Sequence, residues 1–262
     1  MLLAVDIGNT STTLGVFAGE GLRGTWRVGT DRGRSPDEYG LLLQGLLRHE
    51  GMEPEAIADV VAASVVPDLD PIFQEACRRY LHGIDPFMVG PGVRTGLRIL
   101  YQEPQEVGAD RVADAVAAVR LYGAPVVVVD LGTATVFDAI SAQGDYLGGA
   151  IAPGVAIAAE ALFQRAAKLY RVELKRPKSA IGRNTAAALQ SGFYYGYVGL
   201  IEGVVARFRQ ELGGQAKVVA TGGWAEAVAA ECPSIDVVNP NLTLIGLRLV
   251  YQMNRGEGDA EG

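Results

Sequence analysis

Cysteine and histidine are scarce in this sequence, which has two of each among 262 residues. Cys77 and Cys232 are far apart and neither belongs to a Cys-x-x-Cys pair, so the sequence predicts free thiols instead of a disulfide or a metal site. His49 and His82 each lie near the end of a predicted helix, where the helix dipole favours them. This scarcity disfavours both a hydrolase with a Ser-His-Asp triad and a zinc site built from histidines.

Long apolar runs and long basic runs are also missing. No apolar run approaches the ~20 residues that a membrane helix needs. The opening run has no basic flank and is interrupted by Asp6, so it does not resemble a signal peptide. The 30 acidic residues outnumber the 23 basic ones, for a net charge of −7, which argues against nucleic acids and anionic membranes as partners. We therefore expect a globular cytoplasmic protein, and this charge does not exclude an anionic small molecule held by local dipoles.

The common nucleotide and hydrolase motifs are absent too. The sequence contains no Gly-x-x-x-x-Gly-Lys-Ser/Thr, no His-Glu-x-x-His and no Gly-x-Ser-x-Gly. A P-loop and a Rossmann site both need a glycine-rich turn that opens a helix. The polar turns of this sequence lead into strands instead, so neither site fits.

The sequence opens on an apolar run that ends in Asp6, followed by Gly8, Asn9 and a second apolar run. This pattern predicts a β-hairpin, because Gly and Asn tolerate the positive φ that tight hairpin turns require. The turn offers one carboxylate and many hydrogen-bond donors: backbone N–H groups, the Asn9 amide, and the hydroxyls of Thr10, Ser11, Thr12 and Thr13. Such a set suits an anion accompanied by a cation. Taken alone, an ordinary edge hairpin with a polar turn explains the pattern equally well.

The same pattern returns between Pro125 and Asp138, where a buried strand leads to Asp130, a glycine and hydroxyl-bearing residues. Asp130 lies 124 residues after Asp6, close to half the chain. Two copies of one acidic hairpin suggest a duplicated domain with a ligand held between the halves. Both carboxylates fall at the carboxyl ends of buried strands, where they can hold a metal ion and orient phosphates. In the alternative interpretation, each Asp only caps its own turn.

Strands alternate with helices along the rest of the chain, which predicts open sheets covered by helices. Ser35 and Glu38 have the spacing of a capping box, so a helix should begin there. Its buried face should consist of Leu41, Leu42, Leu43, Leu46 and Leu47. The other strands are predicted at residues 22–28, 60–66, 87–89, 125–130 and 217–220. The other helices are predicted at residues 71–81, 112–121, 155–169, 185–212, 224–232 and 242–253.

The helix predicted at residues 185–212 carries four glycines, Gly192, Gly196, Gly199 and Gly203. Glycines at this spacing let another helix approach closely, so the helix is a candidate interface with a second subunit. Glycine-induced irregularity without any dimer is the alternative.

Asp110 follows Gly108 and Ala109 and immediately precedes Arg111 at the start of a helix. One interpretation is a first-turn Asp stabilised by the helix dipole, with Arg111 solvated. The other is a general base that accepts a proton from a substrate hydroxyl, while Arg111 binds an anionic group of that substrate. The pattern leaves both open. Tyr101 is likewise either an aromatic wall of a site or a surface residue.

Four segments in this order resemble the type III pantothenate kinase family: Asp6–Thr10, Gly108–Arg111, Asp130–Thr135 and Gly148–Gly154. The Asp hairpins and the turn Thr221–Gly223, which would let the backbone approach a nucleobase or ribose, resemble a wider superfamily. It includes acetate kinase, sugar kinases, actin and the actin-like chaperone ATPases. The resemblance implies an α/β fold of duplicated actin-like (ribonuclease H-like) domains, with mixed sheets flanked by helices. It also implies a ligand cleft between two halves, at residues 1–120 and 121–262.

The family phosphorylates the primary hydroxyl of pantothenate with ATP, giving 4′-phosphopantothenate in the first step of coenzyme A biosynthesis. It acts as a cytoplasmic homodimer and uses Mg²⁺ with a monovalent cation, K⁺ or NH₄⁺. The resemblance implies that Asp110 is the catalytic proton acceptor and that Asp130 holds the monovalent cation. It implies ATP contacts from Asp6, Ile7, Gly8, Asn9, Thr10, Ser11, Thr12, Thr13 and Thr133. It implies pantothenate contacts from Tyr101, Gly108, Ala109, Asp110, Arg111 and Thr185.

Three positions depart from the family pattern. Glu103 precedes Pro104 where Asn is common, and Asp114 and Val136 stand where Asn and Thr are common. Glu103 adds a negative charge near a site that is expected to bind an anion. Two other functions stay open: a kinase for another small hydroxylated substrate, because fold does not fix substrate, and a non-catalytic regulator or accessory factor of the same fold. The three expected site carboxylates are all present, which counts against the regulator.

Overall fold

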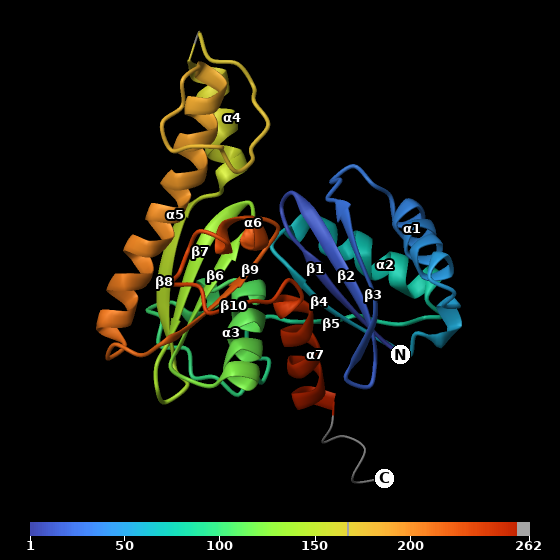
Figure 1. Cartoon of the computed structure of the whole chain (residues 1–262). Helices are drawn as coiled ribbons and strands as arrows, with labels where there is room; N and C mark the ends of the chain where they lie inside the picture. Colours follow the sequence, from blue (N-terminus) through green and yellow to red (C-terminus); the bar gives the residue numbers. More distant parts are fainter. Residues whose placement is uncertain (167, 256–262) are drawn as a thin grey trace. The chain divides into compact units, whose positions relative to one another are not determined.

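The computed structural model describes residues 1–166 and 168–255, and these form two compact units (Figure 1). The first unit holds residues 1–97, residues 102–117 and helix α7 (Leu242–Arg255). The second unit holds residues 98–101 and 118–241. The predicted halves at residues 1–120 and 121–262 follow the duplicated motifs along the chain and stay a prediction. The structure adds that α7, although last in sequence, packs with the first unit.

The first unit is built on a five-stranded mixed sheet in the order β3-β2-β1-β4-β5. Strands β1, β2 and β3 are consecutive antiparallel neighbours, whereas β4 and β5 run parallel to β1. Antiparallel neighbours need only a short turn, while parallel ones need a longer crossover, and α1 and α2 lie in these crossovers. The strands are β1 (Leu2–Ile7), β2 (Ser11–Ala18), β3 (Gly21–Gly29), β4 (Asp59–Ser64) and β5 (Phe87–Met88).

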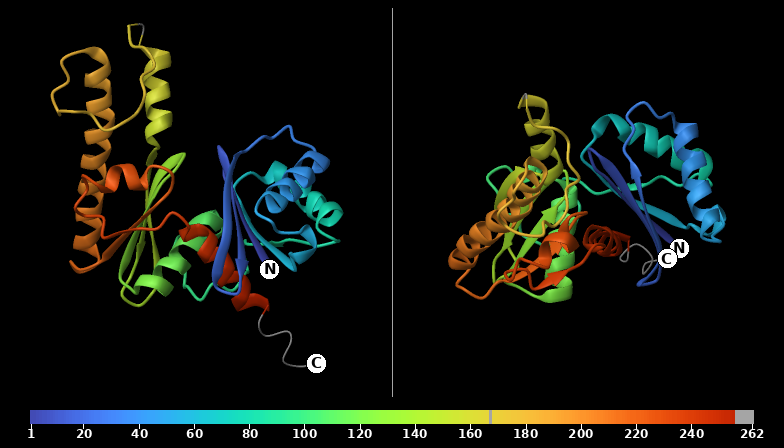
Figure 2. Two further views of the ribbon diagram at one scale, coloured as in Figure 1. Left: turned by 45° about the vertical axis from the view of Figure 1, so that its right-hand side comes forward. Right: turned by 45° about the horizontal axis from the view of Figure 1, so that its top comes forward.

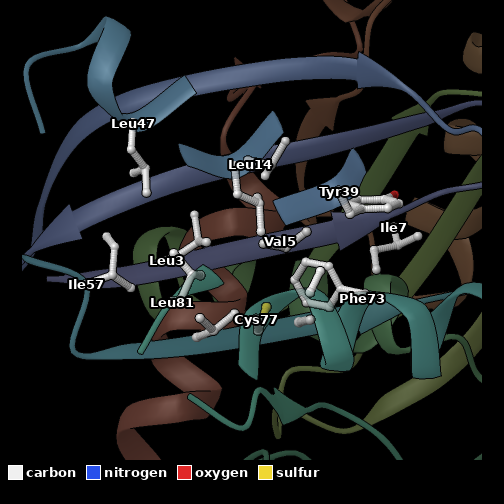
Figure 3. Packing of buried hydrophobic residues seen from close by; sticks show 14 of the residues in the cluster. Leu3, Val5, Ile7, Leu14, Tyr39, Leu47, Ile57, Phe73, Cys77 and Leu81 are labelled. Carbon is white, nitrogen blue, oxygen red and sulfur yellow. The ribbon is translucent and has the colours of Figure 1, made fainter. Parts of the chain in front are cut away.

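Helices α1 (Pro36–His49) and α2 (Asp70–Tyr80) cover one face of this sheet. Figure 3 shows the core between these helices and the sheet. In this core, side chains of β1 and β2 such as Val5 and Leu14 lie with Tyr39, Phe73 and Cys77 of the helices. The opposite face of the sheet is contacted by α7. Burial of aliphatic and aromatic side chains on the α1/α2 face is the main source of stability for the first unit.

The predicted start of α1 is confirmed, because the Ser35 hydroxyl accepts from the Glu38 N–H and the Glu38 carboxylate accepts from the Ser35 N–H. The predicted buried face is wrong at Leu41, whose side chain is 62% exposed. Leu43 and Leu47, one turn apart, are buried. Five leucines within seven residues span more than one helical face, so one of them must point to solvent.

The second unit repeats the strand arrangement of the first. Its sheet has the order β10-β9-β6-β7-β8, in which β6, β7 and β8 are antiparallel and β9 and β10 run parallel to β6. Read from the β8 end, this is the order of the first sheet. The strands are β6 (Val126–Leu131), β7 (Ala134–Ile140), β8 (Tyr146–Pro153), β9 (Lys217–Thr221) and β10 (Val237–Val238). Two mixed sheets flanked by helices confirm the predicted α/β fold class.

Helices α5 (Thr185–Glu211) and α6 (Ala225–Ala229) pack against one face of the second sheet (Figure 2). Ile201 and Val205 of α5 are fully buried in a cluster that includes Val127 and Val129 of β6. At the sheet edge, the chain segment that precedes residue 102 joins β8, because Ile99 forms a parallel bridge with Tyr146.

Several predicted boundaries differ from the structure. Helix α3 (Ala109–Tyr122) begins three residues before the predicted position, so Asp110 lies inside its first turn. Helix α4 (Val155–Arg165) ends four residues early, where Ala166 adopts an extended backbone. Helix α6 is shorter than predicted, and the two-residue strand β10 was not predicted. Three short 3₁₀ helices complete the fold: Pro54–Ala56, Pro67–Leu69 and Pro104–Glu106.

Within residues 1–166 and 168–255, none of the helices has both the length and the apolar character that crossing a bilayer requires.

The contrast between two leucines of α1 gives a test of the fold. We expect Leu43→Ala to lower the free energy of unfolding by about 2–5 kcal/mol, because it leaves a cavity in the core. Leu41→Ala, on the exposed side of the same helix, should change it by less than about 0.5 kcal/mol. Urea denaturation followed by circular dichroism measures both. Equal losses would contradict the burial of Leu43.

Candidate functional site

The turn between β1 and β2 forms the first part of the candidate site. Asp6 is the next-to-last residue of β1 and pairs across the sheet with Thr13 of β2. Residues 8–10 join the strands, and the Gly8 N–H donates to the Ser11 carbonyl over 3.1 Å. The predicted positive φ at Gly8 and Asn9 is wrong, since neither residue adopts it. The three-residue connection reverses the chain without left-handed backbone.

Thr30, just after β3, holds this turn from the outside. Its N–H donates to the Thr10 carbonyl over 3.1 Å, and its hydroxyl donates to the Gly8 carbonyl over 2.7 Å. The Thr30 Oγ1 also lies 3.0 Å from the Thr12 Oγ1. The turn is therefore fixed by hydrogen bonds to both its backbone and one of its side chains.

Two arginines bind the side chains of the same turn. Arg27 of β3 donates from Nε to the Ser11 Oγ over 2.9 Å, and Arg32 donates from Nη2 to the Asn9 Oδ1 over 3.0 Å. Neither contact was predicted from the sequence. The predicted third strand could have indicated them. If that strand pairs antiparallel with β2, its last residues lie beside the turn between β1 and β2.

Asp110 lies in the first turn of α3, where its Oδ1 accepts from the Arg111 N–H over 2.8 Å. A β-carbon on Gly108 would lie 2.3 Å from this same oxygen and 3.7 Å from Val65. Only glycine leaves the carboxylate room here. The Val65 N–H in turn donates to the Ile7 carbonyl over 3.0 Å. The first unit thus brings Gly108 and Asp110 to the end of the sheet where Asp6 lies.

Asp130 occupies the equivalent position in the second unit, at the next-to-last residue of β6. Gly222 lies against it with φ +88°, and a β-carbon there would be 2.3 Å from the Asp130 Oδ1 and 2.7 Å from the Leu131 backbone. Both the positive φ and the close approach require glycine. The Trp224 N–H donates to the Leu131 carbonyl over 3.2 Å. The predicted turn Thr221–Gly223 therefore contacts the second Asp hairpin directly.

Thr133, in the turn after β6, contacts the end of β8. Its carbonyl accepts from the Gly154 N–H over 3.0 Å. Tyr101 packs on Gly148 of the same strand, since a β-carbon on Gly148 would lie 3.3 Å from its ring.

Thr185 begins α5, whose N-terminus is capped by the Asn184 side chain. It lies in a separate groove, whose lining includes Leu162, Gly182, Arg183 and Phe193.

An apolar pocket lies behind the second turn, between β6, α5 and α6. Burial raises the pKa of Tyr194 and Tyr197 above the ordinary tyrosine value. Their hydroxyls donate to the carbonyls of Ala227, over 2.8 Å, and Pro153, over 2.6 Å. The lining includes Leu131, Gly132, Thr135, Val155, Phe193, Tyr194, Tyr197 and Trp224. No local sequence pattern predicts this pocket, because its walls come from separate elements.

In the part of the chain that the structure describes, no three or more His, Cys, Asp or Glu side chains gather closely enough to hold a metal ion. A cation at Asp6 or Asp130 must therefore take other oxygen ligands, such as hydroxyls, carbonyls, water or phosphates. Mg²⁺ is usually held in this way, by one or two carboxylates together with the phosphates of a substrate. The single carboxylate at each hairpin fits that pattern.

Comparison with solved structures supports the fold. The chain is similar to a Baf family transcriptional activator from Campylobacter jejuni, with a TM-score of 0.61 and 20% identity over 97% of this chain and 99% of that one. It is also similar to an activator of 2-hydroxyisocaproyl-CoA dehydratase from Clostridium difficile, with a TM-score of 0.53 and 13% identity over 100% of this chain and 98% of that one. At these identities the likeness is one of fold alone.

Comparison with sequences is more specific. The profile of the family described as type III pantothenate kinase matches residues 2–207. The chain is 54% identical to the type III pantothenate kinase of Moorella thermoacetica, over 97% of this chain and 100% of the relative. It is 52% identical to that of Myxococcus xanthus, over 97% of this chain and 99% of the relative. With matches of this extent and identity, the chain belongs to the type III pantothenate kinase family.

Proposed function

We propose that this protein transfers the γ-phosphoryl group of ATP to pantothenate, giving 4′-phosphopantothenate in the first step of coenzyme A biosynthesis. The observation that carries the proposal is family membership over nearly the whole chain. The first unit agrees with it, because the Asp6 hairpin and the Gly108–Asp110 turn approach each other through Val65. A phosphate-binding hairpin beside a carboxylate base is the arrangement that phosphoryl transfer to a hydroxyl needs.

The hairpin from Asp6 to Thr13 is proposed to bind the ATP phosphates, with Thr133 as a further ATP contact. Its turn exposes backbone N–H groups, an amide and hydroxyls, which stabilise the charge of the transferred group. Asp6 would hold Mg²⁺ together with the phosphates, and Mg²⁺ would neutralise charge that develops during transfer.

Asp110 is proposed to accept the proton of the pantothenate hydroxyl, and Arg111 to bind the pantothenate carboxylate. The absence of a side chain at Gly108 supports these roles, because it lets the Asp110 carboxylate lie against the Gly108 backbone without being displaced. The remaining proposed pantothenate contacts are Tyr101, Gly108, Ala109 and Thr185. Because the transition state of phosphoryl transfer is loose, positioning contributes more than the base does.

Asp130 is proposed to hold a monovalent cation, K⁺ or NH₄⁺. Its carboxylate lies at the end of β6, against Gly222 and beside the turn that contains Thr133. A bound cation there would offset the negative charge of the carboxylate and of ATP. Oxygen ligands of this kind are the ones that hard cations prefer.

We further propose that the protein acts as a homodimer through α5. A β-carbon on Gly192, Gly196 or Gly199 would meet no atom of the described chain within 4 Å, so this face of the helix is open. The same unit exposes large apolar side chains, among them Ile151 at 65% and Ile157 at 48%. Exposed apolar surface beside small residues is typical of helices that pack against a partner.

A cytoplasmic location is proposed as well, in agreement with the free thiols of Cys77 and Cys232.

The direct test is ADP release by the purified protein, with and without pantothenate and in K⁺ or Na⁺. We expect release that depends on pantothenate and is faster in K⁺. Release without any pantothenate dependence would point to another substrate, and no ADP under any condition would favour a non-catalytic regulator.

Asp110→Asn should lose most turnover while keeping ATP affinity, because the amide preserves size but cannot accept the proton. The loss should be about 10²–10⁴-fold if Asp110 acts as a general base. Asp59→Asn, at the opposite end of β4 from Ser64, is the control and should turn over normally. Near-normal turnover of Asp110→Asn would remove Asp110 from the mechanism.

Gly222→Ala should raise the K⁺ concentration needed for half-maximal activity, because the new β-carbon displaces the Asp130 carboxylate. Gly214→Ala is the matched control, since Gly214 has a similar φ of +96° but no atom within 4 Å of the added carbon. It carries the backbone strain without the clash and should leave the K⁺ response unchanged. Identical K⁺ responses in the two variants would argue against a cation at Asp130.

Gly196→Leu should convert the dimer to a monomer, because leucine blocks close helix approach. Gly45→Leu in α1, where the added carbon also has open space, is the matched control and should stay dimeric. Leucine is a strong helix former, whereas glycine is about 0.8–1 kcal/mol less favourable than alanine in a helix, so neither variant should unfold. Sedimentation velocity measures the mass, and a dimeric Gly196→Leu protein would place the interface elsewhere.

A further inference from the structure

A row of three polar side chains crosses the first sheet next to the turn that is proposed to bind phosphates. The register pairs Asp6 of β1 with Thr13 of β2, and Thr13 with Arg27 of β3. Residues directly opposite each other in a sheet share a face. Asp6, Thr13 and Arg27 therefore project from the same face, which is opposite to the α1/α2 core that holds Val5 and Leu14.

The bond from Arg27 to Ser11 fixes the role of the serine hydroxyl. A guanidinium group has donors and no acceptor, so the Arg27 Nε–H must use a lone pair of the Ser11 Oγ. The hydroxyl hydrogen of Ser11 is thereby directed away from Arg27. Ser11 then presents a donor, which is what an anion requires.

The hydrogen bond from Arg32 to Asn9 likewise fixes the orientation of the Asn9 side-chain amide. Arg32 can only donate, so the carbonyl oxygen of the Asn9 side chain must face it. The two N–H groups of the amide then point away from Arg32, at the exposed tip of the turn. Without the guanidinium, the amide could rotate and present its oxygen, which would repel a phosphate.

These two arginines are not needed to hold the backbone of the turn. Thr30 already binds the carbonyls of Gly8 and Thr10. Arg27 and Arg32 contact side chains instead, and no ion pair with a carboxylate is found for either among the described residues. Their charges therefore remain available to offset the charge of an anion on the turn and that of Asp6.

We propose that Arg27 and Arg32 are positioning residues for the phosphates of ATP: they orient Ser11 and Asn9 so that both side chains present hydrogen-bond donors, and they add positive charge to the turn. The identity of the anion rests on the proposed function, whereas the orientation of the donors rests on the two hydrogen bonds.

The test compares Arg27→Gln and Arg32→Gln with Arg23→Gln. Arg23 lies on β3 four residues before Arg27, near the opposite end of the strand from the turn, and is the matched control. The dissociation constants of ATP and of inorganic tripolyphosphate, measured by calorimetry without turnover, should rise about 5- to 30-fold in the first two variants and stay unchanged in the third. In the kinase assay, the KM for ATP should rise while the KM for pantothenate stays constant.

A double-mutant cycle separates positioning from general electrostatics and from loss of structure. Ser11→Ala and Arg27→Gln combined should weaken ATP binding no more than the stronger single variant does, because Arg27 acts through Ser11. Arg27→Lys should recover part of the affinity. Fully additive losses, or wild-type affinity in Arg27→Gln and Arg32→Gln, would overturn the proposal.

The calorimetric measurement of ATP binding tests the role of Arg27 and Arg32 separately from the proposed kinase function. If the wild-type protein binds ATP but releases no pantothenate-dependent ADP, the proposed function fails, and the affinities of the arginine variants still decide the role of Arg27 and Arg32. If the wild-type protein is an active pantothenate kinase and these variants bind ATP normally, only the positioning role fails.

Discussion

The site depends on carboxylates that lie against glycine backbone. Asp110 and Asp130 each have an oxygen within 2.3 Å of where a β-carbon would stand, on Gly108 and Gly222 respectively. Any side chain at these glycines would displace the carboxylate or the backbone behind it. Each carboxylate can therefore take its position only because the neighbouring glycine has no β-carbon.

Asp6 and Asp130, the carboxylates of the two hairpins, are placed by the same sheet topology. In both units a central strand, β1 or β6, ends in an Asp-x-Gly turn and lies between an antiparallel hairpin partner and a parallel strand. The antiparallel partner returns the polar turn to the strand end, and the parallel strand leads the next segment to the same edge. Val65 after β4 and Gly222 after β9 lie in these equivalent places and contact the first and second hairpins.

Local patterns were sufficient to predict much of this arrangement. The hairpins, the Ser35 capping box and the start of α5 at Thr185 are all confirmed, because each depends on residues close together in sequence. The errors have local causes as well. The positive φ expected at Gly8 assumed a two-residue turn, and the late start predicted for α3 followed the apolar pattern, which begins after the first helical turn.

The sequence by itself determined the two Asp hairpins, their repeat and the segment Gly108–Arg111, because strand alternation and turn chemistry are properties of neighbouring residues. Only the tertiary structure decided which distant groups meet them. Gly222 reaches Asp130 across 92 residues of chain, Arg27 and Arg32 reach the first turn through strand pairing, and α7 joins the first unit from the end of the chain. Such contacts follow from the register and packing of whole elements, which no local pattern encodes.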